Sequence, residues 1–520
     1  MSGIPNKPIL PMSTSKQRSS KSKRRRSSSG HQPRTDISVE ELEPGQAVKP
    51  PDAGPSSRAK RQKRKERTTA RYVAAMQLDN EIMAMRDAQS DLDAAAEEDR
   101  IASEALQKAR EQEAHEAEYE RVGKEIREEM RQGQYSVAEK LLQMFTGMNN
   151  IKLHVIRDED RQQYIQALKA LETKRRQPLS SKDPEFPLTQ TLPIFQPGFH
   201  ICVHEKTMNI LLECRITPWG EMNMKERESK LQAIHTIMAF TQSANGIKTN
   251  GSQTFQDHAK KSNNNVNKPK PHGNMFAGGW HRTKGERGVH LSRYTVDKSG
   301  GSETRQKKID IYSETSEDFS HVAEEYSEGL RRMYPLGYNV LKQHAEMYDV
   351  PSFNQLEMDT LHGKPIVNAF ANSITITNDD FANYQHMDRD AIAIAYGWWW
   401  IGWQDPRTKT WHVKDEYDHD KVQGGEFLVA EHGVMIDFSR ARGLVEIFWR
   451  GNSDHHGTMR STSSEGVTRF GTSIQITADA VAGMAAWKDD GYNPAKIVGH
   501  ASRLEFAWDS MQRAKSKKRS

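Results

Sequence analysis

The sequence predicts an α+β protein in which a basic, disordered tail and a long helical arm precede a folded domain with a β-rich second half. Three changes of composition support this prediction. Ser, Pro, Lys and Arg dominate residues 1–67, whereas residues 68–132 are rich in Ala, Glu, Arg, Gln and Met and contain no proline. From Ile366 to Thr477, short β-rich runs alternate with Gly, Asn and Asp turns, which indicates an antiparallel sheet or barrel.

The tail at residues 1–67 is the most basic part of the chain. Residues 1–75 contain 18 Lys and Arg against 6 Asp and Glu, a net charge of +12, while the whole chain of 520 residues carries +5. The clusters Lys21–Arg26 and Arg58–Lys65 suit nuclear import or contact with nucleic-acid phosphates, so we expect a nuclear protein. A solvated, disordered tail is the alternative, and the two interpretations are compatible.

The helical arm is assigned to residues 68–175. Its apolar side chains keep helical spacing only in patches, which favours a long exposed helix over a stable coiled coil. Formation of a homo-oligomer through this arm is left open. Two shorter amphipathic segments between Tyr135 and Lys174 are expected to form a helical hairpin.

The folded domain is assigned to residues 185–490, after a proline-rich boundary. It is expected to contain two strands, a helix, a flexible polar insertion and a second helix that Pro335 breaks, in that order. These elements are placed at residues 200–203, 209–216, 224–242, about 244–272 and 319–347. Residues 491–520 form a carboxy-terminal segment that ends in a basic tail.

The composition also excludes several classes of protein. Cys202 and Cys214 are the only cysteines, too few for a secreted disulfide scaffold or a zinc finger, so we expect a reducing intracellular compartment. No secretory signal is recognisable at the amino terminus. The most apolar run, Ala391 to Trp403, is too short to span a bilayer, so no membrane partner is expected.

One short motif points directly to metal chemistry. His386 and Asp388 are two residues apart, so both side chains face one side if the strand Ser373–Thr377 extends through His386. With 20 histidines in the chain, about one His-x-Asp is expected by chance, so the motif requires a third ligand. The strand candidate Val445–Trp449 leads into the adjacent pair His455–His456, which can supply it. Two histidines and one carboxylate suit Fe(II) and oxygen chemistry, because three coordination positions stay open.

The ordered motifs of the folded domain resemble the TET and J-binding-protein class of Fe(II)/2-oxoglutarate dioxygenases, especially fungal TET-like proteins. The resemblance covers roughly Phe186 to Trp487. It rests on Ile216–Gly220, Gly273–His281, Tyr348–Ser352, Phe381–Asp388, Gly424–Gly425, His456–Thr458 and Thr468–Gly471. It implies a double-stranded β-helix (jelly-roll) core with flanking helices. It also implies Fe(II) as the cofactor, with 2-oxoglutarate and O2 as cosubstrates.

The resemblance assigns roles to individual residues. His386, Asp388 and His456 would be the catalytic metal ligands, since in the family the distal histidine is followed by a small residue and threonine. Arg469 would bind the far carboxylate of 2-oxoglutarate, because a guanidinium pairs bidentately with a carboxylate.

Two further residues are candidates for binding the target base. They are Asn274 and Asp390. The chain departs from the family pattern at the second of them, because Asp390 lies one position before the usual polar residue and Ala391 occupies that place.

Two other clusters are interpreted as structural. The sequence Asp418-His-Asp420 looks like a metal-binding motif, but its polar surroundings favour an exposed charged turn. Trp398, Trp399, Trp400 and Trp403 are assigned to core packing rather than to stacking on nucleic-acid bases.

Three functions remain open from the sequence. The first is oxidation of 5-methylcytosine in DNA to 5-hydroxymethylcytosine, and then further, with the methylated base flipped into the pocket. The second is oxidative demethylation of N6-methyladenine or of methylated RNA. The third is a catalytically inactive, transposon-associated protein that binds nucleic acid.

Overall fold

The computed structural model describes residues 121–147, 150–157, 161–247, 272–283, 288–358, 370–413 and 419–517, with scattered positions from Glu97 to Glu120. The chain divides into two compact units, Met1–Gln107 and Lys108–Ser520. The predicted tail and almost all of the predicted insertion lie outside the described residues.

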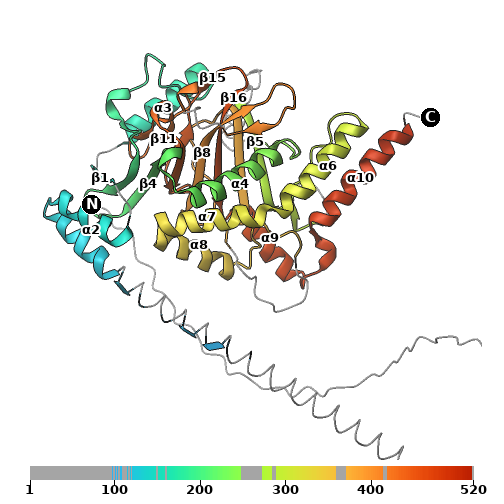
Figure 1. Ribbon diagram of the computed structural model, residues 1–520, viewed down its shortest axis with the longest axis horizontal. Helices are drawn as coiled ribbons and strands as arrows, with labels where there is room; N and C mark the ends of the chain where they lie inside the picture. Colours follow the sequence, from blue (N-terminus) through green and yellow to red (C-terminus); the bar gives the residue numbers. More distant parts are fainter. Residues whose placement is uncertain are drawn as a thin grey trace, which may run out of the picture. The chain divides into compact units, whose positions relative to one another are not determined.

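A large mixed sheet forms the centre of the second unit (Figure 1). Within the described residues it has eleven strands, in the order β1-β3-β4-β13-β8-β16-β7-β5-β6-β17, with β9 paired to β8. The pairs β1/β3 and β6/β17 are parallel, and all other pairs are antiparallel. The strands are β1 (Ile151–Ile156), β3 (Gly198–His204), β4 (Ile210–Thr217), β5 (His272–His281), β6 (Leu291–Arg293), β7 (Ser373–Ala382), β8 (Ala395–Gln404), β9 (Trp411–His412), β13 (Leu444–Trp449), β16 (Val467–Gln475) and β17 (Ile497–Val498).

A smaller sheet lies against one face of the large one. Its order is β14-β11-β12-β2, made from β14 (His456–Thr458), β11 (Phe427–Val429), β12 (Val434–Ile436) and β2 (Leu192–Ile194). A separate pair joins β10 (Val422–Gly424) to β15 (Ser461–Ser463). Aromatic rings connect the two sheets: the ring of Phe427 lies 5.5 Å from Trp399 and 5.1 Å from Trp449. The space between the sheets is therefore a packed interior.

Helices cover the opposite face of the large sheet, as Figure 1 shows for α4 and α7. They are α4 (Met224–Thr241), α6 (Ser302–Glu317), α7 (Phe319–Met333) and α8 (Pro335–Met347). Pro335 ends the helical run and then occupies the first turn of α8, where its missing N–H leaves no bond unmade. The structure confirms the predicted break there, and it confirms the predicted strand pair β3/β4 and the helix α4.

A buried ion pair joins these helices to the sheet. Nζ of Lys230 on α4 lies 3.2 Å from Oε1 of Glu446 on β13, and neither side chain is more than 1% exposed. The Tyr396 hydroxyl donates to the same carboxylate at 2.7 Å. Burial alone would raise the pKa of Glu446, but Lys230 and Arg215 lower it to about 2. The carboxylate is therefore charged in the core, and removal of Lys230 would leave it unpaired.

The amino-terminal arm differs from the prediction. A strand, β1, lies between α2 (Tyr135–Thr146) and α3 (Gln162–Arg175), so these segments do not form a helical hairpin. Strand β1 pairs in parallel with β3 and so extends the large sheet; its end residues Ile151 and Ile156 are buried, and the four between them are half-buried. The folded unit therefore begins well before residue 185.

The carboxy-terminal segment also contains regular structure. It forms α10 (His500–Lys517), which follows α9 (Ala478–Asp489) and packs against α6. No helix in the described part of the chain has both the length and the apolar character needed to cross a membrane.

Candidate metal centre

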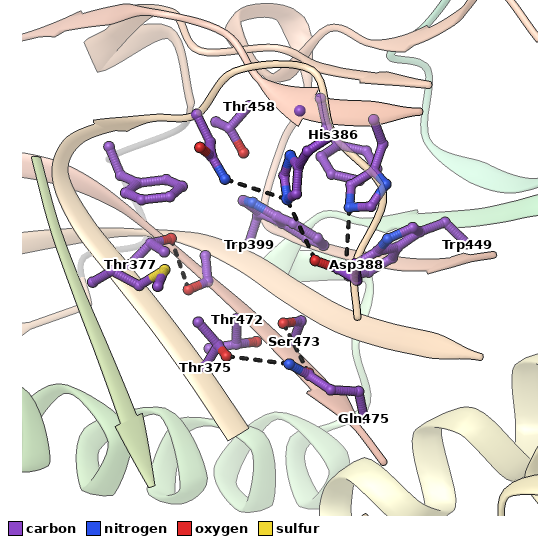
Figure 2. Close-up of a pocket in the computed structure, with 17 residues that line it drawn as sticks. Thr375, Thr377, His386, Asp388, Trp399, Trp449, Thr458, Thr472, Ser473 and Gln475 are labelled. Carbon is purple, nitrogen blue, oxygen red and sulfur yellow. Dashed lines mark hydrogen bonds and ion pairs between the residues drawn. The ribbon is translucent and has the colours of Figure 1, made fainter. Parts of the chain in front are cut away.

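Three side chains converge between the two sheets. The ligand atoms of His386, Asp388 and His456 all lie within 4.8 Å of one another. Nε2 of His386 is 3.3 Å from one carboxylate oxygen of Asp388, and Nε2 of His456 is 3.2 Å from the other. Figure 2 shows the imidazole of His386 turned toward this carboxylate at the wall of a cavity, and His456 lines the same cavity. Because the three donors would occupy one side of a metal ion, the other side would stay open for further ligands, as Fe(II) oxygenase chemistry requires.

The backbone brings the two histidines together. The N–H of His386 donates to the carbonyl of His456 at 3.0 Å, and the N–H of His456 donates back at 2.9 Å. Strand β7 has already ended at Ala382, so the predicted continuous strand through His386 is wrong. A single β-bridge to β14 places His386, while the N–H of Asp388 is held by the carbonyl of Gly451 at 2.8 Å.

Gly457 permits the close approach of the two segments. A Cβ at this position would lie 3.0 Å from the carbonyl oxygen of Asn383 and 3.2 Å from that of Tyr384. Any side chain would therefore push the two ligand-bearing segments apart. This geometry accounts for the small residue in the motif His456-Gly-Thr458.

Hydrogen bonds to the backbone orient both imidazoles. Nδ1–H of His386 donates to the carbonyl of Tyr384 at 2.7 Å, and Nδ1–H of His456 donates to that of Asp454 at 2.9 Å. With hydrogen on Nδ1, each ring directs the Nε2 lone pair at the common centre. Burial alone would raise the pKa of Asp388, but His456 and His386 hold it well below its usual range. The three residues can therefore offer two imidazole nitrogens and a carboxylate to one metal ion.

The neighbouring His455 faces the other way. Its Nδ1–H donates to the carboxylate of Glu431 at 3.0 Å, and its Nε2 accepts from Nζ of Lys169 at 2.8 Å. Adjacent strand residues point to opposite faces, so only His456 reaches the centre. The structure thus brings the three predicted ligands together and leaves His455 outside.

Arg469 lies at alternating strand positions with Gly471 and Ser473 on β16, so it belongs to the same face of the large sheet. Its guanidinium donates to the carbonyls of Val422 and Gly424 at 2.9 and 2.8 Å. It does not line the cavity around the triad. Burial lowers the pKa of Arg469 to about 10, which still leaves it a cation at neutral pH.

His419 completes the surroundings of Arg469 and corrects one prediction. The sequence favoured an exposed turn around Asp418-His-Asp420, but His419 is completely buried. Its Nδ1 accepts from Nε of Arg469 at 3.1 Å, and its Nε2–H donates to the carbonyl of Gly443 at 3.0 Å. Burial and Arg469 lower the pKa of His419 to about 3, so it is neutral. Asp418 lies outside the described residues.

Two cavities adjoin the triad. The smaller, about 110 Å³, is lined by the three ligands and by hydroxyl and amide side chains such as Thr377, Asn383 and Gln475. The larger, about 680 Å³, is lined by His281, Arg389 and Asp390, among others. Both share Met275, Thr375, Asp388 and Gln475. The metal position therefore lies where a small and a large compartment meet.

The two predicted base-binding residues have different locations. Asp390 lines the larger cavity, and one of its carboxylate oxygens is buried with no hydrogen-bond partner. Asn274 is on neither cavity wall, and its amide donates to Asn378 at 3.2 Å. The structure brings only Asp390 to the site.

Core packing, predicted for all four tryptophans, is complete for two of them, and Trp403 is only half-buried. Trp398 and Trp400 are completely buried among core side chains. Trp399 points the opposite way, toward the smaller sheet, and forms part of the wall of the smaller cavity.

Comparison with known proteins gives one family and several distant structures. Residues 243–461 match the Tet-like 2OG-Fe(II) oxygenase superfamily. The solved structure of NgTET1 in complex with 5mC DNA is 10% identical, with 65% of this chain and 94% of that chain covered and a TM-score of 0.28. A dioxygenase for auxin oxidation in rice is 11% identical over 51% of this chain and 73% of that one, with a TM-score of 0.19. No curated protein matches the chain.

The matched region contains His386, Asp388 and His456, the three residues that the geometry selects as ligands. The donor set, two imidazoles and a carboxylate with hydrogen bonds that fix both rings, fits Fe(II). Residues 243–461 therefore form a Tet-like 2OG-Fe(II) oxygenase domain, and the protein is a 2-oxoglutarate-dependent dioxygenase that uses Fe(II) and O2.

Proposed function

We propose that the protein oxidises 5-methylcytosine in DNA to 5-hydroxymethylcytosine. The observation that carries this proposal is the position of Asp388, a metal ligand that lines both cavities. A cosubstrate in the smaller cavity and a flipped nucleotide in the larger one would then meet at the metal. The larger volume, about 680 Å³, lies within the range of cavities that bind small ligands.

The cosubstrate would lie between the triad and Arg469. Among the described residues, no lysine or arginine lines the smaller cavity, although 2-oxoglutarate carries two carboxylates. Arg469 is a buried cation on the same face of β16, and no carboxylate of the described chain is within ion-pair distance of it. The hydrogen-bond partners of Arg469 are carbonyl groups and an imidazole, while Glu426, Asp380 and Asp437 act on it only from beyond ion-pair distance. A buried cation without a directly paired carboxylate favours an anion. We therefore keep Arg469 as the partner of the far carboxylate.

Glycine gives this arginine its position. The backbone at Gly425 has φ of +75°, and a Cβ there would lie 2.5 Å from Nη1 of Arg469. Only glycine accommodates both the conformation and the guanidinium. Because the Gly424–Gly425 segment carries no side chains, it could move aside when the carboxylate binds.

The substrate would enter the larger cavity as a base turned out of the duplex. The methyl group of 5-methylcytosine is not accessible to a buried metal while the base is stacked, so flipping is required. Asp390 lines that cavity and is the candidate to bind a polar edge of the base. Bound Fe(II), with O2 and 2-oxoglutarate, supplies the oxidising power for hydroxylation of the methyl group.

We also propose that the two sheets form a double-stranded β-helix. The chain alternates between them: β7 is in the large sheet, His386 bridges to the small one, and β8 returns to the large sheet. The alternation continues through β11 and β12, then β13, then β14 and finally β16. Such a wrapped path encloses the interior from which the metal ligands project.

The basic tail would add affinity for DNA that does not depend on sequence, and it would direct the protein to the nucleus. Residues 1–75 carry +12, and binding such a segment to DNA releases counterions from the phosphates. This release is less favourable at higher salt concentration, so binding should weaken steeply as the salt concentration rises. Association of two chains through the helical arm stays a prediction.

The test is turnover on matched oligonucleotides. Duplexes that contain 5-methylcytosine or N6-methyladenine, and a methylated RNA, would be incubated with protein, Fe(II) and 2-oxoglutarate, and their nucleosides quantified by mass spectrometry. We expect 5-hydroxymethylcytosine from the first duplex and slower or no reaction on the others. Preferred reaction of methyladenine or RNA would replace the proposed substrate. If the iron-loaded wild-type protein shows no more turnover than the His386→Ala variant, the result would favour the inactive nucleic-acid-binding protein.

A further inference from the structure

Helix α3 lies before the family-matched region yet packs directly on the sheet that carries His456. Its apolar residues Leu168 and Leu171 share a core with Leu428 of β11 and Met435 of β12. Figure 1 places α3 beside β11. Because residues 243–461 define the family match, this helix is an addition from outside that region.

Glu172 of α3 contacts the segment that carries the first two ligands. Its carboxylate accepts from the backbone N–H of Gln385 at 2.9 Å, one residue before His386. Glu172 is only 4% exposed, although carboxylates are seldom fully buried unless they have a specific partner. Its position follows from packing: α3 buries Leu168 and Leu171 on the same side.

Lys169, one helical turn earlier, contacts the other ligand segment. Its Nζ donates to Nε2 of His455 at 2.8 Å, and Nδ1–H of His455 donates to Glu431. His455 directly precedes His456 in the chain. Residues three apart on a helix lie on neighbouring positions of one face, so Lys169 and Glu172 can reach both ligand segments together.

We propose that α3 is a positioning element of the iron centre. Glu172 holds the His386 segment, and Lys169 holds the His456 segment through His455. These contacts support the two segments that the backbone bridge between His386 and His456 joins, before the metal binds. Groups that orient metal ligands in this way typically change metal affinity about 10–100-fold when they are removed. The inference concerns the metal centre alone and does not depend on the identity of the substrate.

The test is a titration of metal-free protein with Co(II), which serves as the probe for the Fe(II) site, followed by its visible absorption. The full-length chain is used throughout. We expect Glu172→Ala to weaken Co(II) binding about tenfold or more. Glu172→Gln should stay within about threefold of wild type, because its amide oxygen can still accept from Gln385. Lys169→Met should weaken binding by a smaller factor.

Lys174→Met is the matched control. Lys174 lies on the same helix, but its Nζ pairs with Glu185 on the surface and contacts neither ligand segment. Its Co(II) affinity should equal that of wild type. Hydrogen exchange of residues 383–388 in the metal-free protein gives a second measurement, and Glu172→Ala should exchange faster there while Lys174→Met should not.

Two results would overturn the proposal. One is Co(II) affinity within about twofold of wild type in both Glu172→Ala and Lys169→Met. The other is equal weakening by Glu172→Gln and Glu172→Ala, which would show that the hydrogen bond is not what matters. If Glu172→Ala fails to fold, Glu172→Gln and the exposed Lys169→Met decide the matter. A protein that binds Co(II) as expected but leaves methylcytosine unchanged would contradict only the proposed function.

Discussion

His386 and His456 exchange two backbone hydrogen bonds, at 3.0 and 2.9 Å, although 70 residues of chain separate them. The bridge sets their rings 4.7 Å apart, measured between centroids, on one side of Asp388. The two nitrogen ligands are thus placed by main-chain geometry rather than by the metal. A centre preorganised in this way keeps its shape when the metal is removed.

The ligand set can be tested by substitution. His456→Ala removes a ligand nitrogen, and we expect Co(II) affinity to fall by more than about 100-fold. The loss of a ligand should weaken metal binding more than the loss of a group that only orients a ligand, which costs about 10–100-fold. Asp388→Asn should do the same by removing the charged oxygen. Isothermal titration of metal-free protein with Co(II) measures both effects.

His455→Ala is the control for that experiment. His455 bonds to Lys169 and Glu431 and faces away from the centre, so its loss should weaken metal binding far less than that of His456. The assignment would be reversed if His455→Ala removed Co(II) binding while His456→Ala retained it.

Gly457→Ala should separate the two ligand segments. The added methyl would lie 2.7 Å from Nε2 of Gln385 and 3.0 and 3.2 Å from the backbone oxygens of Asn383 and Tyr384, all in the segment that carries His386. We expect the free energy of unfolding to fall by about 1–3 kcal/mol and metal affinity to fall with it. Urea unfolding and Co(II) titration provide the two readouts.

Gly220→Ala is the matched change for Gly457→Ala. No heavy atom lies within 4 Å of a Cβ at Gly220, so this variant should retain both stability and metal affinity. Wild-type metal affinity in Gly457→Ala would disprove the close-packing explanation for the motif.

Arg469→Met should reduce binding of 2-oxoglutarate to Co(II)-loaded protein by at least about tenfold, since a charge-assisted pair is lost. The sharper measurement compares 2-oxoglutarate with 2-oxobutyrate, which lacks the far carboxylate. Wild type should prefer the dicarboxylate, and the variant should lose that preference.

Stability must be measured on the same variant. Arg469 bonds to the carbonyls of Val422 and Gly424, so its loss also lowers the free energy of unfolding. A folded Arg469→Met protein that still prefers 2-oxoglutarate would assign Arg469 a structural role only.

The buried His419 predicts a loss of stability in acid. Its pKa is lowered to about 3 in the folded protein, against about 6.5 in the unfolded chain. Between these pH values the unfolded chain binds a proton that the folded chain does not. The contribution of neutral His419 to the free energy of unfolding is therefore fully present well above pH 6.5 and decreases as the pH falls. From pH 7.5 to 5.0 this one group should remove about 2 kcal/mol.

Urea unfolding at pH 7.5 and 5.0 checks this prediction. His419→Gln should be less stable at pH 7.5, but it should lose about 2 kcal/mol less than wild type on acidification. The exposed His412→Gln should show the wild-type dependence. Equal acid sensitivity of wild type and His419→Gln would show that His419 does not titrate with unfolding.

Much of the site was accessible from the sequence because short motifs are local. His386 and Asp388 are two residues apart, and the pattern around His456 favoured it over His455; the structure brings His456, and not His455, beside Asp388. The reason given for the first pair was incomplete, since a bridge and not a continuous strand holds His386. A bridge between segments 70 residues apart leaves no periodic pattern in either one.

The residues that support the site were not predicted, because their roles depend on tertiary contacts. Glu172 lies in a helical sequence with nothing to mark it as buried against Gln385. His419 is flanked by charged residues that suggest a surface turn, yet Arg469 and Gly443 enclose it. Strand β1 was taken for part of a helical arm because only its pairing with β3 distinguishes it.

The most direct test of the central claim is isotopic. Iron-loaded protein would be incubated with 2-oxoglutarate, a duplex containing 5-methylcytosine and ¹⁸O₂, and the nucleosides and succinate would be measured by mass spectrometry. We predict 5-hydroxymethylcytosine that carries one ¹⁸O atom, with at least one succinate formed for each product and neither formed by Asp388→Asn. Unchanged 5-methylcytosine, from protein shown to bind Fe(II) and 2-oxoglutarate, would contradict the account.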